Sequence, residues 1–192
     1  MNVEGEAVDV DGEAATNPDV TTAANTDVSA AANGAVMSGD NGFRYPLDVR
    51  FFEVDSLGVV FNMWYLGWCD EAMSAFMESI GYGYATLRAV GVDAVLRKAD
   101  LEWLDSLEAF QHAEVAVRVD HVGTTSFRLG YDINRVDNLR VDSGQVDASG
   151  DAGQPRRRCA HAAITYVCVE IEGRNTTPIP SGLREALVSD HA

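Results

Sequence analysis

The chain has 192 residues, which fits one domain or one domain with a tail. Hydrophobic residues make up 46% of it, enough for a packed core, and no apolar run approaches the roughly 18 residues of a membrane span. The N-terminus is acidic where a signal peptide would be basic and then apolar, so we expect a soluble, cytoplasmic protein.

The charge of the chain is strongly negative. Its 30 Asp and Glu residues outnumber 14 Lys and Arg residues, for a formal net charge of −16. We do not expect nucleic-acid binding, because neutralising phosphates requires cations that this chain lacks. Lys98 is the only lysine, and residues 43–192 still carry a net −8 without the acidic first 42 residues. This composition is typical of adaptation to high salt, where ions screen self-repulsion.

Two segments have a composition that argues against packed structure. Residues 1–42 contain no aromatic residue and consist mostly of small and polar types, so we predict a disordered acidic tail. Residues 137–157 are polar and too long for an ordinary hairpin loop, so we predict a flexible insertion. The folded domain is therefore expected over residues 43–192.

The domain begins with a β-rich run over residues 44–54, in which Tyr45, Leu47, Val49 and Phe51 alternate. A polar turn follows, and then a helical pattern with Asn62 as its N-cap and Gly81 as its stop. One stripe of this helix is apolar, and its first two turns are apolar almost all round. That pattern predicts a helix buried by its surroundings.

The rest of the domain reads mainly as β-structure. After a short helical stretch over Tyr84–Ala89, we predict strands over residues 92–104, 113–122, 125–136 and 159–171. The first three follow one another closely, which favours an antiparallel meander, and residues 178–188 predict a terminal helix. The fold class is therefore α+β, with one antiparallel sheet wrapped around one long buried helix.

The chemically informative segment precedes the long helix. Asp55 stands at the end of the first β-run, Gly58 allows a tight turn, and Asn62 begins the helix. A helix N-terminus presents unpaired N–H groups that can polarise a carbonyl and stabilise an oxyanion. A carboxylate close by can act as a base or a nucleophile. On spacing alone, the usual reading of Asp55 is a simple turn-former, because Asp is common before glycine turns.

The run over residues 54–72, V-D-S-L-G-V-V-F-N-M-W-Y-L-G-W-C-D-E-A, closely resembles the hotdog-fold acyl-CoA thioesterases of the 4-hydroxybenzoyl-CoA thioesterase type. These proteins share an Asp, a Gly-Val-Val or Gly-Ile-Val, an Asn or His, a Tyr, and an acidic residue followed by Ala. The turn over residues 123–127 and the Pro-Ile-Pro at 178–180 are also similar to the family. The resemblance spans residues 44–188.

The resemblance implies roles for individual residues. Asp55 matches the catalytic carboxylate, and the N–H of Asn62 matches the group that polarises the thioester oxygen. Positions near the substrate are matched by Gly58, Val59, Tyr65, Trp68, Ser126 and Phe127. The other reading of Tyr65 and Trp68 is a plain place in the helix core, and for Trp68 this reading is at least as good. Some hotdog enzymes use a helix carboxylate instead, which makes Asp70 or Glu71 a second candidate.

The chain departs from the family at two positions. Many relatives have His where this chain has Asn62, which leaves Asp55 without a His nearby in sequence. Basic residues near the turn at 123–125 often meet the phosphates of coenzyme A, and here that turn is Gly-Thr-Thr. Arg128 or the Arg156–Arg158 cluster are the candidates for that contact.

The resemblance implies hydrolysis of an acyl-CoA thioester with no metal or other cofactor. It also implies a homodimer or a dimer of dimers with the active site at the interface, since a single hotdog sheet leaves an open edge. Two other readings stay open on the same fold: a non-catalytic acyl-CoA-binding module and an enoyl-CoA hydratase. The hydratase type needs an Asp and a His close together near the helix, and no His lies between residues 43 and 111.

Overall fold

The structure is a computed structural model that describes residues 36–37, 42–136 and 156–190. Most of the predicted tail and insertion therefore lies outside the described residues. The structure corrects one residue boundary of each of these two predicted segments. Val36–Met37 form a short strand, β1, which pairs with the next strand and so is not disordered. Strand β6 begins at Arg156, inside the predicted insertion, because Arg156 and Arg157 continue the ladder with the preceding strand.

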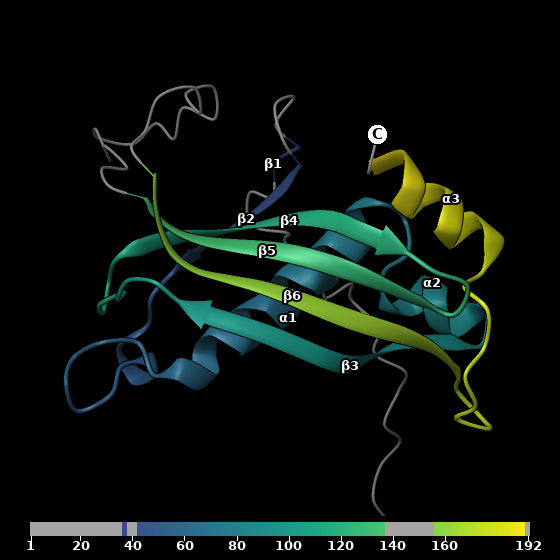
Figure 1. The fold of residues 1–192 in the computed structure, drawn as a ribbon, viewed down its shortest axis with the longest axis horizontal. Helices are drawn as coiled ribbons and strands as arrows, with labels where there is room; N and C mark the ends of the chain where they lie inside the picture. Colours follow the sequence, from purple (N-terminus) through teal and green to yellow (C-terminus); the bar gives the residue numbers. More distant parts are fainter. Residues whose placement is uncertain (1–35, 38–41, 137–155, 191–192) are drawn as a thin grey trace, which may run out of the picture. The chain divides into compact units, whose positions relative to one another are not determined.

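One antiparallel sheet forms the framework of the domain (Figure 1). After β1, its strands are β2 (Phe43–Asp48), β3 (Val92–Trp103), β4 (His112–Val122), β5 (Ser126–Val136) and β6 (Arg156–Glu170). Their order across the sheet is β1-β2-β4-β5-β6-β3. Since β1 has two residues, the sheet consists in effect of five long strands.

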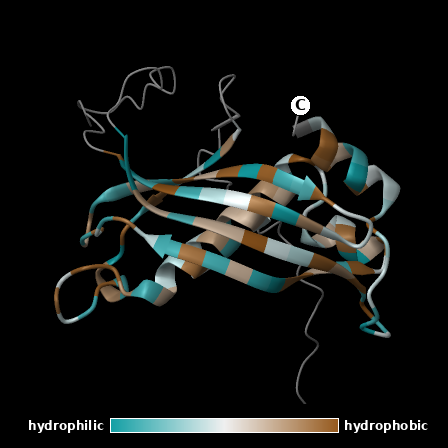
Figure 2. Cartoon of the chain, viewed as in Figure 1, coloured by the Kyte–Doolittle hydropathy of each residue, from teal (hydrophilic) through white to brown (hydrophobic). Residues whose placement is uncertain are grey.

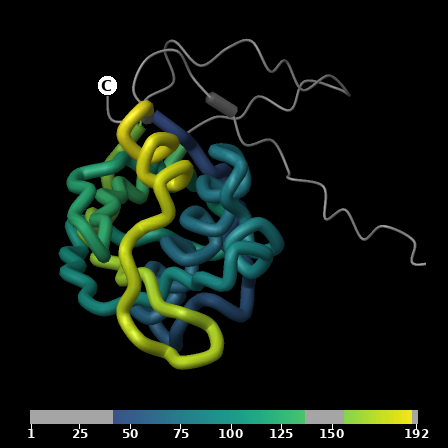
Figure 3. The backbone as a smooth tube through the Cα atoms, turned by 90° about the vertical axis from the view of Figure 1, so that its right-hand side faces the viewer, coloured from purple at the N-terminus to yellow at the C-terminus, as the bar shows by residue number. Residues whose placement is uncertain are grey.

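Helix α1 (Asn62–Ser79) lies against one face of this sheet. Its apolar stripe is largely buried, through Tyr65, Trp68, Cys69, Ala72 and Phe76. These side chains share one hydrophobic core with alternating residues of the strands, such as Phe127, Leu129, Tyr131 and Ile133 on β5. Figure 3 shows the sheet curving around the helix, with residues 171–190 crossing the end that faces the viewer. The predicted α+β arrangement of a sheet around one helix is confirmed.

The order of the strands differs from the predicted meander in one respect. Strands β4, β5 and β6 are consecutive neighbours, but β3 pairs with β6 at the far edge and does not touch β4. Residues 104–111 make this possible by crossing the end of the sheet. Leu107 in this crossing segment is fully buried, and its carbonyl accepts the N–H of Val60 at 2.8 Å.

The first β-run is shorter than predicted. Strand β2 ends at Asp48, and residues Phe51–Glu53 form a turn of 3₁₀-helix. The cause is Val49, which is buried and donates its N–H to Gln111, so the chain bends there and leaves Phe51 exposed. The short helix α2 (Tyr84–Ala89) matches its prediction, and α3 (Ser181–Asp190) begins directly after Pro180. Among the described residues, no helix is long and apolar enough to cross a membrane.

Candidate active site at the start of helix α1

Asp55 lies at the turn of a small hairpin that leads into α1. Residues Val54 and Val60 form an antiparallel bridge, and the Asp55 N–H donates to Val59 O at 2.8 Å. Gly58 closes the turn by donating its N–H to Asp55 O at 3.0 Å. Its φ of +79° is a left-handed conformation that L side chains rarely adopt, which explains the glycine at this position.

The Asp55 carboxylate takes part in this turn. Its Oδ1 accepts the N–H of Leu57 at 2.8 Å, the side-chain bond of an Asx turn. The side chain is half-buried, and Oδ2 has no hydrogen-bond partner among the described residues. The structure thus shows the turn-forming role directly, and it leaves one carboxylate oxygen for other chemistry.

The N-terminus of α1 lies at the other end of the same hairpin. Phe61 is its N-cap and Asn62 its first helical residue, so the prediction of Asn62 as the N-cap is wrong by one position. The backbone of Phe61 adopts the extended N-cap conformation, and its N–H donates to Glu53 O at 2.9 Å. No side chain caps this end of the helix. The Asn62 N–H therefore belongs to the group of unpaired donors that a helix N-terminus presents.

Glu53, two residues before Asp55, is a site residue that the sequence did not reveal. It is fully buried, with an exposed fraction of 0%. Its carboxylate accepts the Arg50 N–H at 2.7 Å and Trp68 Nε1–H at 3.1 Å, and Arg50 Nε lies 3.6 Å away. A charged residue in a run of mostly apolar residues gives no local signal of burial, because its partners lie on other elements.

Tyr65 and Trp68 lie in the core of the described chain. Both are buried, their rings meet at a tilt with centroids 5.1 Å apart, and Tyr65 also contacts the Trp103 ring edge-on at 6.4 Å. Burial raises the pKa of the Tyr65 phenol to about 12. The structure shows both side chains in the helix core, the alternative that the sequence left open, and substrate contact by either stays a prediction.

The predicted substrate residues do not all lie together within one chain. Gly58 is exposed in the hairpin, and Val59 is half-buried and bridges to Glu108 of the crossing segment. Ser126 and Phe127 lie at the opposite end of the sheet, level with Val167 and Tyr166 of β6. Phe127 is buried and stacks on Tyr166 at 5.4 Å.

The helix carboxylates have different surroundings. Glu71 is exposed and accepts weak bonds from Arg50 and from the Tyr45 hydroxyl at 3.3 Å. Asp70 lies on the edge of a cavity of about 200 Å³ between α1, α2 and the start of β3. The other residues that line this cavity are largely apolar or aromatic, and they include Met73, Met77, Tyr82 and Leu87.

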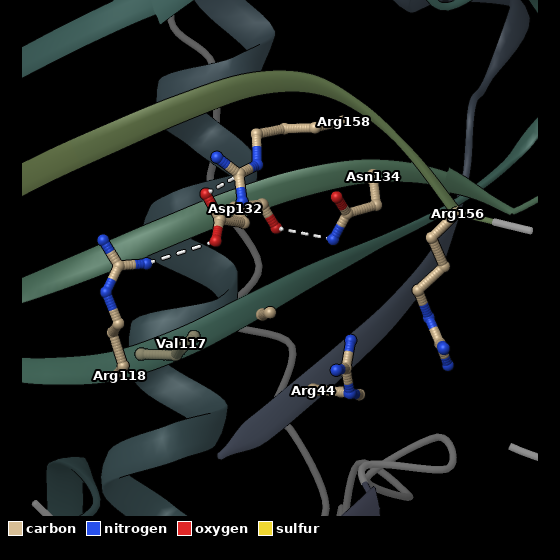
Figure 4. Close-up of a pocket in the computed structure, with 8 residues that line it drawn as sticks. Arg44, Val117, Arg118, Asp132, Asn134, Arg156 and Arg158 are labelled. Carbon is tan, nitrogen blue, oxygen red and sulfur yellow. Dashed lines mark hydrogen bonds and ion pairs between the residues drawn. The ribbon is translucent and has the colours of Figure 1, made fainter. Parts of the chain in front are cut away.

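A second cavity, of about 260 Å³, lies on the face of the sheet that points away from α1 (Figure 4). Arg44 and Arg156 line it and share the carboxylate of Glu114, at 2.5 and 2.7 Å. On its other side Arg118 and Arg158 both point to Asp132, at 3.3 and 3.2 Å. The predicted arginine cluster is therefore divided, because Arg157 points elsewhere and pairs with Asp105. Each cluster arginine has a carboxylate partner, and a role in phosphate binding stays a prediction.

Large exposed apolar side chains surround the hairpin, which is mostly coloured hydrophobic in Figure 2. We call this set the apolar rim; it consists of Phe51, Phe52, Leu57, Phe61, Met63, Trp103, Leu104 and Phe110. Leu57 is 83% exposed, and Phe51 and Phe110, stacked on each other, are 72% and 74% exposed. Such a concentration of exposed apolar surface marks an interaction or ligand site.

The three cysteines are free thiols in the core. Burial raises the pKa of Cys69 to about 12 and of Cys168 to about 11, and it also raises the pKa of Cys159. A buried thiol with a raised pKa is a poor nucleophile, since the thiolate is the reactive form. Their chemistry is that of small hydrophobic residues, as their sequence context indicates.

Comparison with known proteins identifies the family. Residues 49–187 match the model of the thioesterase-like superfamily, and the chain belongs to that superfamily. A protein of Aquifex aeolicus (strain VF5), named "Putative esterase", is 28% identical over 95 residues, which cover 50% of this chain and 74% of that protein.

Solved structures show that the fold is the hotdog fold of thioesterases, as predicted. A 1,4-dihydroxy-2-naphthoyl-CoA thioesterase from Synechocystis is similar with a TM-score of 0.59 and 20% identity, covering 76% of this chain and 95% of that one. A gentisyl-coenzyme A thioesterase is similar with a TM-score of 0.60 and 21% identity, covering 75% of this chain and 98% of that one.

Proposed function

We propose that this protein hydrolyses an acyl-CoA thioester to a free carboxylic acid and CoA. The observation that carries the proposal is the hairpin, in which Asp55 pairs with Val59, two residues before the N-cap Phe61 of α1, whose N-terminus no side chain caps. Membership of the thioesterase-like superfamily and the likeness to two acyl-CoA thioesterases support the choice of substrate.

The proposed reaction uses the two ends of the hairpin together. The carbonyl oxygen of the thioester accepts the Asn62 N–H, which stabilises the negative charge that develops on it. Asp55 either takes a proton from the attacking water or attacks the carbonyl carbon itself to form an anhydride that water then opens. The C–S bond breaks, and the CoA thiolate leaves and takes up the proton.

A second copy of the chain completes the proposed site. Within the described part of the chain, strand β3 is hydrogen-bonded to β6 along one edge, so its other edge can pair with another strand. Leu96 and Trp103 of β3 point to the same face as the buried Tyr166 and Ala160 opposite them. Leu96 remains 44% exposed, and Trp103 remains 46% exposed although its ring meets Tyr65 of α1. Pairing of two β3 strands would cover these side chains together with the apolar rim.

Two-fold pairing of β3 also explains why the predicted substrate residues lie at both ends of the sheet. Antiparallel β3 strands put the start of one strand beside the end of the other. The Asp55 hairpin of one protomer then approaches the cavity beside Asp70, and the Ser126 end of the sheet, in its partner. In this arrangement the acyl group enters the cavity lined by Met73 and Met77.

Thiol release from a panel of acyl-CoAs tests the proposal, with wild type compared to Asp55→Asn in about 1 M KCl. We expect the variant to lose about 100-fold or more of kcat for the preferred substrate, because a general base or nucleophile contributes that much. Asp120→Asn, which changes a carboxylate paired with Arg118 on the outer face, is the matched control and should keep its activity. Equal activity in Asp55→Asn and wild type would contradict the assignment.

One observation favours the alternative of a non-catalytic acyl-CoA-binding module. The Asp55 carboxylate already has a structural role through its bond to Leu57, and a turn residue needs no chemistry. The two functions differ in the same assay, since a binding module retains acyl-CoA in equilibrium dialysis while no thiol is released from any acyl-CoA of the panel.

A further inference from the structure

We propose that Glu53 is a positioning residue, whose buried carboxylate holds the Asp55 hairpin against α1 so that Asp55 and the Asn62 N–H address the same carbonyl group. This inference rests on the proposed function, since it concerns how the two groups of that site are kept in register.

Glu53 connects three parts of the site at once. Through its side chain it accepts a hydrogen bond from Trp68, on the second turn of α1, and another from the backbone of Arg50, at the start of the 3₁₀ turn. Through its backbone carbonyl it accepts the N–H of Phe61, the N-cap of α1. One residue therefore ties the hairpin to the segment before it, to the helix end and to the helix body.

The burial of this carboxylate makes the connection stiff. A fully buried charge is stable only when its hydrogen bonds and its ion pair are kept, so the side chain has little freedom to move without a large cost. Asp55 follows two residues later on the same strand of the hairpin. The direction of the Asp55 side chain relative to α1 thus depends on Glu53, which takes no part in the proposed reaction itself.

The other contacts of the hairpin do not replace this anchor. The hydrogen bond of Val60 to Leu107 and the bridge of Val59 to Glu108 fix the hairpin to the crossing segment. They do not fix it to α1, which carries the Asn62 N–H. Through its hydrogen bond to Trp68, the Glu53 side chain joins the hairpin strand of Asp55 to the helix body, where Phe52 adds only a ring contact with Trp64 at 5.4 Å.

The test compares Glu53→Gln with Glu114→Gln. Glutamine has the shape of glutamate, but Arg50 and Trp68 donate to different carboxylate oxygens, so the carbonyl oxygen of glutamine keeps one of these bonds and its NH₂ group faces the other donor. Glu114 is the matched control, because it is also buried, at 8% exposure, and also pairs with arginine, on the far face of the sheet. We expect Glu53→Gln to lose roughly ten- to hundredfold in kcat with KM within about twofold, and Glu114→Gln to keep wild-type kcat.

Amide hydrogen exchange supplies a readout that is independent of catalysis. In Glu53→Gln the amides of Asp55, Gly58 and Phe61 should exchange about tenfold faster than in wild type, and in Glu114→Gln they should not. If wild type releases no thiol, the proposed function fails while the exchange comparison still tests the anchor. Unchanged exchange in Glu53→Gln, or equal loss of kcat in both variants, would overturn the inference.

A double variant separates positioning from general stability. In the Asp55→Asn background, Glu53→Gln should cause no further loss of activity, because the carboxylate that it positions is gone. Multiplicative losses would contradict the inference. If Glu53→Gln does not fold, Trp68→Phe removes one donor and keeps the buried carboxylate, and it should raise the exchange of the same amides and lower kcat without altering KM.

Discussion

Asp55 serves the turn and the proposed reaction with different atoms. Its Oδ1 accepts the Leu57 N–H, and Oδ2 has no partner among the described residues. The bond to Leu57 fixes the rotation of the carboxylate and so directs Oδ2, in the way that outer hydrogen bonds orient metal-ligating side chains. A turn-forming Asp and a catalytic Asp are therefore compatible at this position.

Gly58 allows a prediction at the same scale. Its φ is +79°, and a Cβ added there would meet nothing within 4 Å, so alanine would suffer from backbone strain alone. Gly81, after α1, has φ +80° and is equally open, which makes it a matched control. We expect Gly58→Ala and Gly81→Ala each to lower the free energy of unfolding by about 1–2 kcal/mol in urea titrations. Only Gly58→Ala should also reduce thiol release, and an equal reduction in both would contradict a special role for the turn.

Residue type predicted part of the site and missed part of it. Asp55, Gly58 and the helix start follow from local rules of turns and helix ends, which act over a few neighbouring residues. The burial of Glu53 depends on Trp68, fifteen positions away, and no pattern near residue 53 contains that contact. Sequence reasoning placed Asn62 one position too early in the helix, because extended Phe61, whose side chain offers no cap, is an unusual N-cap.

At the scale of elements, helix α1 was predictable because its stripe repeats at helical spacing. The position of β3 was not, because strand order depends on pairing between distant segments. Residues 92–103 and 112–122 look like neighbours in sequence, yet the burial of Leu107 sends the intervening segment across the sheet end. The alternation of side chains along β3 would be the same whether β3 paired with β4, as in the predicted meander, or with β6, as it does.

The open edge of β3 yields a prediction about assembly. Leu96 and Val95 are adjacent and similarly exposed, at 44% and 41%, but Leu96 shares the α1 face and Val95 the opposite face. If two β3 strands pair with their α1 faces joined, Leu96→Glu buries an unpaired charge and should weaken the dimer by about 100-fold or more. Val95→Glu should leave the dimer largely intact. Light scattering after size exclusion measures both, and the same mass for the two variants would argue against this interface.

At the scale of the whole molecule, charge is the dominant feature. Carboxylates and arginines alternate over the outer face of the sheet, as in the pairs of Arg118 with Asp120 and of Arg128 with Asp100. These exposed pairs contribute little each, and the chain keeps a net charge of −16. Repulsion among the remaining carboxylates opposes folding unless dissolved ions screen it.

We propose that stability therefore rises with salt. Between 0.05 and 0.5 M KCl the Debye length falls from above 10 Å to well below it, so repulsion between separated carboxylates should fade. We expect the free energy of unfolding to increase by on the order of 1 kcal/mol or more over this range in urea titrations. Sucrose at equal osmolality separates screening from solute exclusion. A decrease with KCl would show that the surface ion pairs outweigh the net repulsion.

The pairing of β3 with β6 has a consequence for how the chain is made. Strand β3 is synthesised before β4 and β5, but β6, its one partner strand among the described residues, ends at Glu170. A nascent chain shorter than this holds β3 with both edges unpaired, and such strands readily pair with other chains. The sheet closes late, over contacts between distant segments, which slows folding relative to a meander of the same strands. The ribosome must therefore release nearly the whole domain before β3 can pair with β6. Until then β3, the strand proposed to join two protomers, lies outside its own sheet.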